Sequence, residues 1–376
     1  MMKRSLTLLS AALCMFSVCA QETPDPEIDL IRQAMPQNVP TPEAKHKVLV
    51  YSKPWGFPHA SIKIGKKMMQ VMSDETGLFE VTISDDLAQF EPDNLSQYDA
   101  VCLNNTTHLQ KGFVKPALRN NLIEFVKKGG GLVAIHSATD GGWEEYTDMI
   151  GGNFDGHPWG ANGTWSIANE DPTHPIVKDV YGGKTFLLKD ELYQYKTFDR
   201  SKVRVLLSVD MASFQNLGRG EKRDDGDYAL AWVRDFDQGR IFVSSLGHNK
   251  EIFYNPEILK MWVEGFRFVL GETDVDTSSI PKPETKNELT DGRRHEARVR
   301  TPEESLAEFE VKDDYYMEVV AADELLDQPV VCTWDGNGNM YVAEMATYMN
   351  DIAGSGTLEN RSQVVRLEDT DGDGRM

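Results

Sequence analysis

Cysteine is scarce in this sequence, and its few cysteines do not suggest a disulfide framework. Two of the four lie at positions 14 and 19, near the N-terminus. The other two, Cys102 and Cys332, fall in different predicted domains within strand-like surroundings, and we therefore expect two buried free thiols. The sequence has no C-x-x-C-H motif, which excludes covalent attachment of a c-type haem to these residues.

Common phosphate and zinc motifs are also missing, as is an excess of basic residues. Neither G-x-x-x-x-G-K-[ST] nor G-x-G-x-x-G follows the glycines at 129–131, which we interpret as a tight turn between a helix and a strand. No H-E-x-x-H motif is present. With 60 acidic against 39 basic residues the formal charge is −21, which argues against binding to nucleic acids or anionic membranes.

The N-terminal apolar segment is too short for an ordinary membrane-spanning helix. Basic residues at positions 3 and 4 precede an apolar stretch at 6–18, and small residues end at Ala20. This pattern predicts a signal peptide over residues 1–20, and hence export to the periplasm or secretion. Neither Cys14 nor Cys19 follows a small residue, so we favour an exported periplasmic or secreted protein over an anchored lipoprotein.

Apolar strands alternate with amphipathic helices over most of the chain. This alternation is typical of an α/β fold with a mostly parallel sheet and helices on both faces, as in flavodoxin-like proteins. The apolar spacing predicts helices at about 61–74, 115–128, 143–150 and 256–270. Strands are predicted at 47–52, 79–84, 98–104, 132–135, 164–169, 185–188, 203–209, 229–233 and 240–245, with antiparallel additions among the later ones.

Two polar stretches divide the chain. Residues 21–45 and 273–300 are rich in proline and charge, and we expect them to be linkers around a domain at 46–272. The remainder, 301–376, predicts an all-β unit with an alternating segment at 316–321, a hairpin at 330–344 and a strand at 364–367. So few strands cannot close a propeller or a sandwich, so we expect this unit to be the truncated start of a longer domain.

Four histidines follow predicted strands or lie in predicted loops. His136 ends the strand at 132–135, His59 follows the first strand, and His248 follows the strand at 240–245, while His157 lies in a glycine-rich loop. Because ligands of open α/β sheets bind at the carboxyl ends of the strands, we expect these side chains to converge on one cavity. The alternative is that each imidazole is satisfied separately by a nearby backbone group.

A cluster of imidazoles with a carboxylate suits several kinds of chemistry. With Glu191, and with Asp190 beside it, the histidines could act as general acids and bases or bind sugar hydroxyls. They could also hold a divalent metal such as zinc, for which His59, His136, His157 and His248 are the candidate ligands. Aromatic stacking platforms could come from Trp55, Trp143 or Trp159.

Other polar residues favour plainer interpretations. His174 lies in a turn-like segment and is predicted to cap a loop, while His46, His108 and His295 are predicted to be surface residues. The stretch 369–374 matches the first half of a calcium loop, but we interpret it as a solvated acidic segment because a calcium site needs six or more oxygen ligands.

Residues 46–272 resemble a ThuA-like (trehalose utilisation) domain of the class I glutamine-amidotransferase-like fold. The resemblance rests on the stretches 56–59, 129–139, 151–158, 174–176, 190–193 and 239–248 in this order. It implies carbohydrate utilisation, with His136, Glu191 and His248 as catalytic residues and with His59, His157, Asp190, Tyr193 and Trp55 as substrate-binding residues. Glutamine amidotransferases carry a nucleophilic cysteine where this chain has His136, so Cys-dependent amide hydrolysis is not expected.

Residues 301–376 resemble the start of a propeller of the membrane-bound dehydrogenase type, on the stretches 301–305, 334–338, 342–345 and 365–374. The resemblance implies that the rest of the propeller, and a haem domain, belong to a longer chain and are potential partners. We therefore expect an exported sugar-processing hydrolase, lyase or isomerase that acts on a glycoside or a keto-sugar. The alternative is a non-catalytic module that binds carbohydrate for an attached sugar dehydrogenase.

Overall fold

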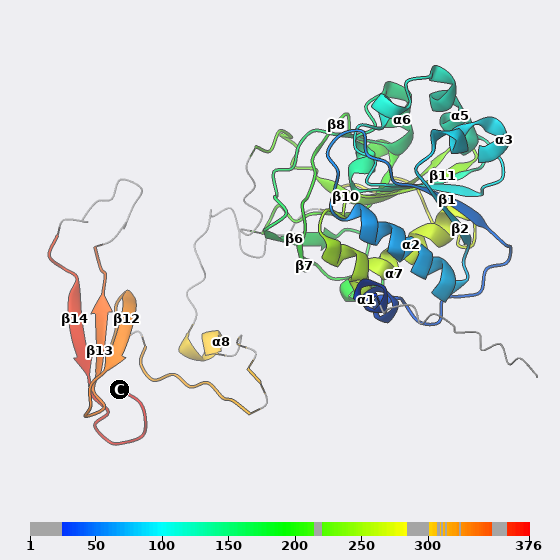
Figure 1. Ribbon diagram of the computed structural model, residues 1–376. Helices are drawn as coiled ribbons and strands as arrows, with labels where there is room; N and C mark the ends of the chain where they lie inside the picture. Colours follow the sequence, from blue (N-terminus) through cyan, green and yellow to red (C-terminus); the bar gives the residue numbers. More distant parts are fainter. Residues whose placement is uncertain are drawn as a thin grey trace, which may run out of the picture. The chain divides into compact units, whose positions relative to one another are not determined.

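The computed structural model describes residues 25–213, 220–283, 301–306, 309, 311–312, 314–322, 325–347 and 359–376. The chain divides into two compact units, residues 1–285 and 286–376 (Figure 1). The predicted signal peptide lies outside the described residues. No helix among the residues described is both long and apolar enough to span a membrane.

A nine-stranded mixed sheet organises the described part of the first unit. Its strand order is β2-β1-β3-β4-β11-β10-β9-β6-β7. The parallel half comprises β2 (Glu80–Ser84), β1 (Lys47–Tyr51), β3 (Ala100–Asn104), β4 (Gly131–Ile135) and β11 (Gly239–Ser244). The antiparallel half comprises β10 (Ala229–Phe236), β9 (Arg204–Val209), β6 (Thr164–Asn169) and β7 (Phe186–Lys189). The predicted fold class, including the antiparallel additions, is confirmed.

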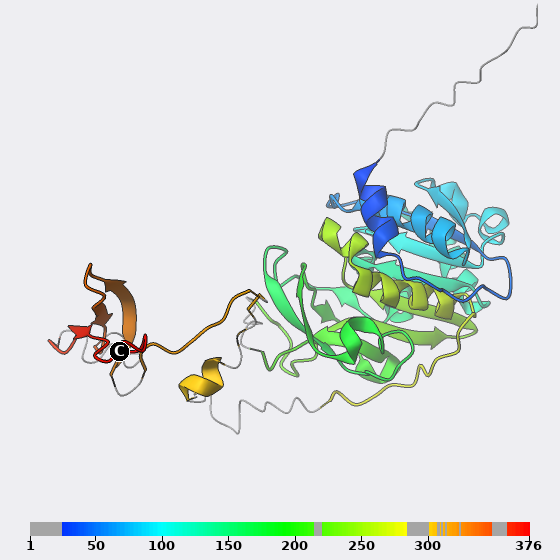
Figure 2. The same cartoon turned by 90° about the horizontal axis from the view of Figure 1, so that it is seen from below.

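Helices cover both faces of this sheet (Figure 1). One face packs against α1 (Pro26–Ala34), α2 (Ile62–Thr76) and α7 (Pro256–Val269), which lie across the same side in Figure 2. The other packs against α5 (Pro116–Lys127) and α6 (Glu144–Ile150), with α3 (Pro92–Leu95) and α4 (Leu109–Gly112) nearby. Alternate strand residues enter the two cores; Val48 and Val50 face one, and Leu49 and Tyr51 the other.

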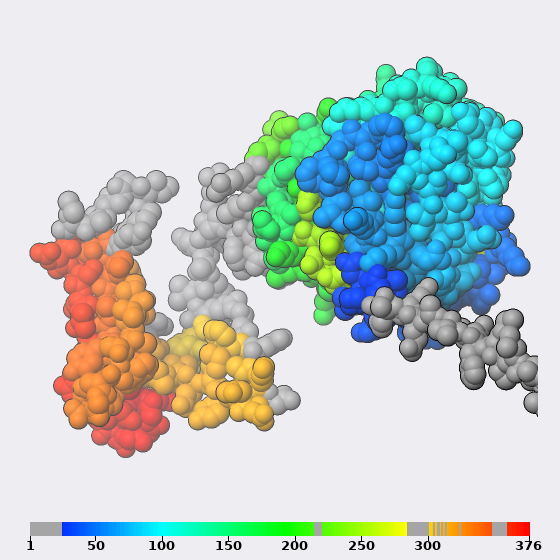
Figure 3. All heavy atoms as spheres, viewed as in Figure 1, coloured from blue at the N-terminus to red at the C-terminus, as the bar shows by residue number. Residues whose placement is uncertain are grey.

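Short elements complete the first unit. They are β5 (Asn153–Phe154), β8 (Tyr195–Lys196) and the 3-10 turns η1 (Leu87–Phe90), η2 (His136–Thr139), η3 (Val180–Gly183), η4 (Arg200–Lys202) and η6 (Lys250–Tyr254). Side chains of residues from about 50 to 125, blue to cyan, cover much of the face of this unit seen in Figure 3.

The stretch before β1 differs from the expected linker. Residues 26–34 form α1, whose N-terminal N–H groups are capped by the side chain of Asp25. Ile31 is fully buried against the α2 side of the sheet, and Lys67 of α2 forms ion pairs with Asp25 and Glu27 at 2.6 Å each. Burial of an apolar helix face thus ties this segment to the first unit.

The parallel strands position the site because their carboxyl ends are in register. Tyr51 of β1 lies beside Leu103 of β3, while Asn104 of β3 and Ser244 of β11 both pair with Ile135 of β4. The loops that follow β1, β3, β4 and β11 therefore emerge side by side at one edge of the sheet. We call this edge the carboxyl edge.

The second unit contains α8 (Pro302–Leu306) and a three-stranded antiparallel sheet among its described residues. Its strands are β12 (Pro329–Trp334), β13 (Met340–Glu344) and β14 (Gln363–Leu367). The predicted hairpin is confirmed, with Asp335 Oδ1 accepting the N–H groups of Asn337 and Asn339 in its turn. The segment 316–321 is not a strand, and Cys332 is exposed rather than buried, because this small sheet leaves β12 uncovered.

Candidate functional site

Three histidines converge at the carboxyl edge, as the strand order predicts. His59 lies in the loop between β1 and α2, His136 directly follows β4, and His248 follows β11. The ring centroid of His136 is 4.8 Å from that of His59 and 5.4 Å from that of His248, and the His59 and His248 centroids are 5.1 Å apart. The three rings meet edge to face at nearly right angles. The alternative of separate, locally satisfied histidines is therefore wrong for these three.

Glu191 joins the cluster from the loop after β7. Its Oε2 atom is 3.0 Å from His248 Nδ1 and 3.7 Å from His136 Nε2, and its Oε1 atom is 3.4 Å from His157 Nδ1. Glu191 is 8% exposed, whereas the side chain of His157 is 55% exposed. One carboxylate thus links the buried imidazoles to an imidazole at the mouth of the site.

The hydrogen bonds of His136 determine its tautomer. Its Nδ1 atom lies 2.7 Å from the Ser245 carbonyl oxygen, which can only accept, so Nδ1 carries the proton. The Nε2 atom of the neutral ring then accepts a hydrogen bond from the Tyr193 hydroxyl at 2.7 Å. The Tyr193 ring also stacks on the imidazole, with 4.2 Å between centroids. His136 thereby presents an unprotonated nitrogen towards Tyr193 and Glu191.

The backbone at His136 adopts a left-handed conformation, with φ of +49°. Residues other than glycine seldom adopt positive φ, and such strain concentrates at functional sites. Gly247 packs against this turn with φ of +130°, and a Cβ atom on it would lie 3.1 Å from Ile135 Cγ2. This turn places His136, the first residue after β4, at the carboxyl edge, where its side chain is fully buried.

Burial and mutual repulsion give the three imidazoles different proton affinities. Burial, followed by repulsion from His248, lowers the pKa of His59 to about 4 although Glu191 opposes the shift. Burial is likewise the main cause that lowers the pKa of His136 well below its usual value. The Glu191 carboxylate, in contrast, raises the pKa of His248 and outweighs the opposing effect of burial. At neutral pH His59 and His136 are therefore neutral, and His248 is the ring that favours a proton.

Asp190 does not line the cavity, contrary to the predicted substrate contact. It is fully buried, and its two carboxylate oxygens accept the N–H groups of Gly247 and Asn249 at 2.7 and 2.8 Å. Burial raises the pKa of Asp190 to about 7 although these hydrogen bonds lower it. Since His248 lies between the two bonded residues, Asp190 positions that histidine.

A cavity of about 450 Å³ opens beside the cluster. Among the predicted site residues, it is lined by His59, His157, Glu191, Tyr193 and His248. Its remaining lining residues were not predicted from the sequence: Phe57, Thr107, His108, Ser137, Asp140 and Phe154. His136 lies behind this lining, with its side chain fully buried.

The three tryptophans proposed as stacking platforms do not line this cavity. Trp143 and Trp159 are buried, and Trp55 donates a hydrogen bond to the Tyr51 hydroxyl and packs closely over Gly112. The aromatic rings in the lining are instead those of Phe57, Phe154 and Tyr193.

Hydroxyl and amide groups support His59 from behind. Its Nδ1 atom is 3.4 Å from both Thr107 Oγ1 and Ser137 Oγ. The Thr107 hydroxyl donates to Ser137 at 2.9 Å, and Ser137 donates to Asn105 Oδ1 at 3.3 Å. These residues follow β3 and β4, so the same strand ends that place the histidines also supply this network.

His108 was predicted to be a surface residue, and the structure corrects this. It lines the cavity, its backbone φ is +55°, and its Nδ1 atom is 2.9 Å from Asp140 Oδ2. A Cβ atom on Gly56 would lie 2.4 Å from the His108 ring, so that glycine makes room for it. His108 and Asp140 form a second ionisable pair on the cavity wall.

The other histidines lie away from this cavity. His174 is buried, accepts the N–H of Ile176 at Nδ1 and contacts the Asp276 carbonyl, which confirms its predicted role in holding a loop. His46 is partly buried beside Glu272, at 2.6 Å, rather than free on the surface. His295 lies outside the described residues.

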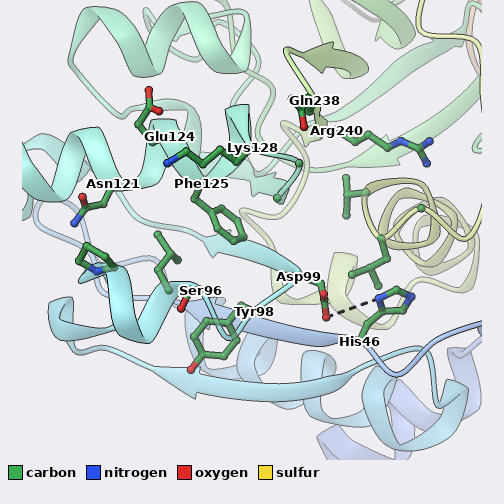
Figure 4. Close-up of a pocket in the computed structure, with 17 residues that line it drawn as sticks. His46, Ser96, Tyr98, Asp99, Asn121, Glu124, Phe125, Lys128, Gln238 and Arg240 are labelled. Carbon is green, nitrogen blue, oxygen red and sulfur yellow. Dashed lines mark ion pairs between the residues drawn. The ribbon is translucent and has the colours of Figure 1, made fainter.

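A larger cavity, of about 770 Å³, lies at the opposite edge, which we call the amino edge (Figure 4). It is formed around the starts of β3, β4 and β11 and is lined by His46, Asp99, Glu124, Lys128 and Arg240 among others. Figure 4 shows its side chains spread around the walls, with one ion pair between His46 and Asp99, 3.8 Å apart.

Neither cysteine offers a nucleophile at the carboxyl edge. Cys102 is fully buried within β3, and burial raises the pKa of its thiol. Cys332 belongs to the second unit. The position that follows β4 is occupied by His136, so the chemistry available there is that of imidazole and carboxylate.

Two clusters of described residues could hold a metal ion. In the first, one ligand atom from each of His59, His136, Glu191 and His248 lies within 4.8 Å of the others. The second comprises Asp369, Asp371 and Asp373, whose exposed or half-exposed carboxylates mainly accept neighbouring backbone N–H groups. Local backbone bonding accounts for that acidic loop without a ligand.

Comparison with known families identifies both parts of the chain. A family model described as trehalose utilisation (ThuA) matches residues 47–269. A domain of unknown function, DUF7133, matches residues 301–376. No curated protein matches the chain significantly.

Two solved structures are similar to the first unit. A ThuA-like protein from Bacteroides uniformis ATCC 8492 aligns with a TM-score of 0.52 and 21% identity, over 62% of this chain and 95% of that one. A ThuA-like protein from Parabacteroides merdae ATCC 43184 aligns with a TM-score of 0.46 and 18% identity, over 64% and 98% of the two chains. The first of these alignments supports the fold assignment. It does not indicate the chemistry, which has to be inferred from the residues of the site.

Proposed function

This chain belongs to the ThuA (trehalose utilisation) family, and from that membership we propose that it processes a carbohydrate, either a glycoside or a keto-sugar, in the cavity at the carboxyl edge. The observation that carries the proposal is that two imidazoles approach the Glu191 carboxylate. Glu191 Oε2 lies 3.0 Å from His248 Nδ1 and 3.7 Å from His136 Nε2. Acid–base catalysis needs donors and acceptors that reach one reacting group.

The residues divide naturally into proton-transfer and binding roles. Glu191 and His248 form a carboxylate–imidazole pair at the cavity wall, able to accept a proton from one substrate atom and return it to another. The neutral His136 ring accepts a hydrogen bond from the Tyr193 hydroxyl and lies beside Glu191, where it helps to position the carboxylate of that pair. This set suits the hydrolysis of a glycoside, or the removal of a proton beside the carbonyl of a keto-sugar.

The cavity lining fits a polyhydroxylated ligand. A volume of about 450 Å³ falls in the range of about 300–1,000 Å³ that is usual for small-molecule sites. Phe57, Phe154 and Tyr193 offer aromatic faces, while Thr107, Ser137 and Asp140 offer hydrogen-bonding groups. His59 and His157 complete the proposed binding surface, and Asp190 contributes by holding the loop of His248.

The wider setting of the protein is part of the same proposal. The basic and apolar pattern of residues 1–20 supports export, with lipoprotein anchoring less favoured. The motifs in 301–376 support attachment to a sugar dehydrogenase through a propeller and a haem domain. An exported unit of this kind would process sugars that the dehydrogenase produces or consumes.

Turnover by the full chain tests the proposal. The purified protein is screened against glycosides and keto-glycosides by chromatography and NMR, beside Glu191→Gln and the amino-edge variant Lys128→Ala as control. Turnover that is lost in Glu191→Gln and kept in Lys128→Ala supports the proposal. Sugar binding without turnover, unchanged in Glu191→Gln, supports the non-catalytic module instead.

A further inference from the structure

We infer that His59, His136, His248 and Glu191 form a binding site for one divalent transition-metal ion, with Zn²⁺ as the best-fitting ion. The inference concerns the cluster itself and stands whichever sugar reaction the protein performs. It rests on the positions of the donor atoms, on the outer partner of His136 and on the close approach of a His248 ring nitrogen to the Glu191 carboxylate.

The donor atoms are already close to the spacing of a zinc site. One ligand atom from each of the four residues lies within 4.8 Å of the others, and two measured separations are 3.0 and 3.7 Å. Tetrahedral zinc with bonds of about 2.0–2.2 Å places its ligand atoms about 3.4 Å apart. Small side-chain movements would therefore bring the four donors to coordination distance.

The arrangement of the rings also suits a shared ion. Their centroids are 4.8, 5.1 and 5.4 Å apart and their planes are nearly perpendicular, so nitrogen-bearing edges can point to a common centre. Three imidazoles with one carboxylate form a nitrogen-rich donor set. Such a set suits zinc and related transition metals, whereas magnesium and calcium require oxygen ligands.

His136 has the outer hydrogen bond of a metal-bound imidazole. A ligating histidine almost always donates its other ring N–H to a carboxylate, a carbonyl or water, which fixes the tautomer and the ring orientation. The Ser245 carbonyl accepts from Nδ1 in this way at 2.7 Å, and leaves the lone pair of Nε2 directed at the cluster.

His248 contributes a ring nitrogen that faces the shared carboxylate. Its buried Nδ1 atom lies 3.0 Å from Glu191 Oε2. An imidazole nitrogen and a carboxylate oxygen are both usual zinc ligands, so an ion could bind both groups at this point.

Tyr193 competes with the ion for His136. Its hydroxyl donates to the same Nε2 atom at 2.7 Å, so metal binding must displace this hydrogen bond. Removal of the hydroxyl should therefore leave metal affinity unchanged or increase it by up to about tenfold, the value of one ordinary hydrogen bond.

Metal titration of the full chain tests the inference. After treatment with EDTA, the protein is titrated with Zn²⁺ by calorimetry and with Co²⁺ by visible absorption. We expect one site per chain and the intense absorption of four-coordinate Co²⁺. His59→Ala, His136→Ala and Glu191→Gln should each weaken binding at least 100-fold, more than the loss of an outer-shell partner usually does.

Two variants are matched controls. His108→Ala removes an imidazole that lines the same cavity outside the cluster, and it should bind Zn²⁺ as the native chain does. Tyr193→Phe should bind equally well or more tightly. Native-like binding in His136→Ala, a loss in His108→Ala, or no binding at millimolar Zn²⁺ by folded native protein would each overturn the inference.

The outcome is independent of the sugar reaction. Zinc binding without turnover on any sugar would contradict the proposed function and leave the metal site in place. Turnover by metal-free protein with no zinc binding would contradict the metal site and leave the proposed function in place. Zinc held instead by the acidic cluster at 369–373 would survive all three cluster substitutions, and would count against the inference.

Discussion

The two cavities of the first unit lie at opposite edges of one sheet and differ in the way their charges are used. At the amino edge, three charged groups each have a separate neighbour: His46 pairs with Glu272, Asp99 accepts the N–H of Lys47, and Arg240 pairs with Asp274. At the carboxyl edge, three imidazoles approach a single carboxylate.

The difference shows that cavity size is a poor guide to the functional site here. The amino-edge cavity is larger, at about 770 against 450 Å³, but His46 and Arg240 in its lining pair with different carboxylates. Parallel strands deliver their following loops to the carboxyl edge, where residues from β1, β3, β4 and β11 meet. Convergence of several imidazoles on one carboxylate, rather than volume, distinguishes the candidate site.

Substitution of His136 should have the largest effect. His136→Gln removes the neutral imidazole that contacts Tyr193 and Glu191, and loss of a residue in an acid–base set lowers the rate by about 10²–10⁴-fold. Lys128→Ala at the amino edge should leave kcat within about twofold, because surface substitutions outside a site have small effects. The measurement is steady-state kinetics on the substrate found by the screen. Equal losses of kcat in both variants would contradict the functional difference between the two edges.

Asp190→Asn should have the next largest effect. Both carboxylate oxygens accept backbone N–H groups, and an amide can replace only one of them, so one buried N–H is left facing an NH₂ group. We expect a loss of about 1–3 kcal/mol in unfolding free energy, measured by urea titration, together with lower turnover. Asp99→Asn is the amino-edge control, since that carboxylate accepts one backbone N–H and is half exposed; unchanged turnover is expected there.

Two glycines with positive φ, one at each edge of the sheet, can be compared as a matched pair of substitution sites. Gly247 at the carboxyl edge has φ of +130° and would place a Cβ atom 3.4 Å from His136 Cβ. Gly129 at the amino edge has φ of +109°, and its Cβ atom would meet the Gln238 carbonyl oxygen at an ordinary contact distance of 3.9 Å. Alanine at either position should cost about 1–3 kcal/mol in backbone strain. Only Gly247→Ala should also lower turnover and zinc affinity, and a matching loss in Gly129→Ala would contradict this assignment.

The smallest effect is expected at Glu272. Burial raises its pKa, but hydrogen bonds from His46 and from the N–H groups of Glu43 and Ala44 outweigh this and lower it. A lowered carboxyl pKa stabilises the native state above the pKa of the unfolded chain, about 4.3, and the stabilisation is lost as pH falls through the folded pKa. Glu272→Gln should therefore cost less than about 1 kcal/mol at pH 7, and this cost should shrink as pH falls through the folded pKa, with turnover at pH 7 unchanged. A greater loss at low pH than at pH 7 would contradict the assignment.

Much of the fold could be predicted from the sequence because its strands are short, apolar and separated by amphipathic helices. The helix at 26–34 was missed because its short pattern lies among prolines, although Asp25 followed by Pro26 is a helix-start signal. The exposure of Cys332 was missed because an apolar strand pattern predicts burial and the sheet that contains it leaves β12 uncovered.

The convergence of His59, His136 and His248 could also be predicted, since parallel strands end at one edge. The contributions of His108 and Asp140 could not, because two loops of irregular backbone bring them together. Nor could the sequence distinguish Asp190 from its neighbour Glu191: one side chain turns to the backbone and the other to the cavity, and no periodicity applies in that loop.

A sugar-bound crystal structure tests the central claim most directly. Crystals of the full chain would be soaked with the glycoside or keto-glycoside identified by the screen, or with the best-binding sugar. We predict density for the sugar in the carboxyl-edge cavity, with its hydroxyl or carbonyl oxygens within hydrogen-bonding distance of Glu191 and His248. Sugar bound in the amino-edge cavity, with the histidine cluster unoccupied, would contradict the account.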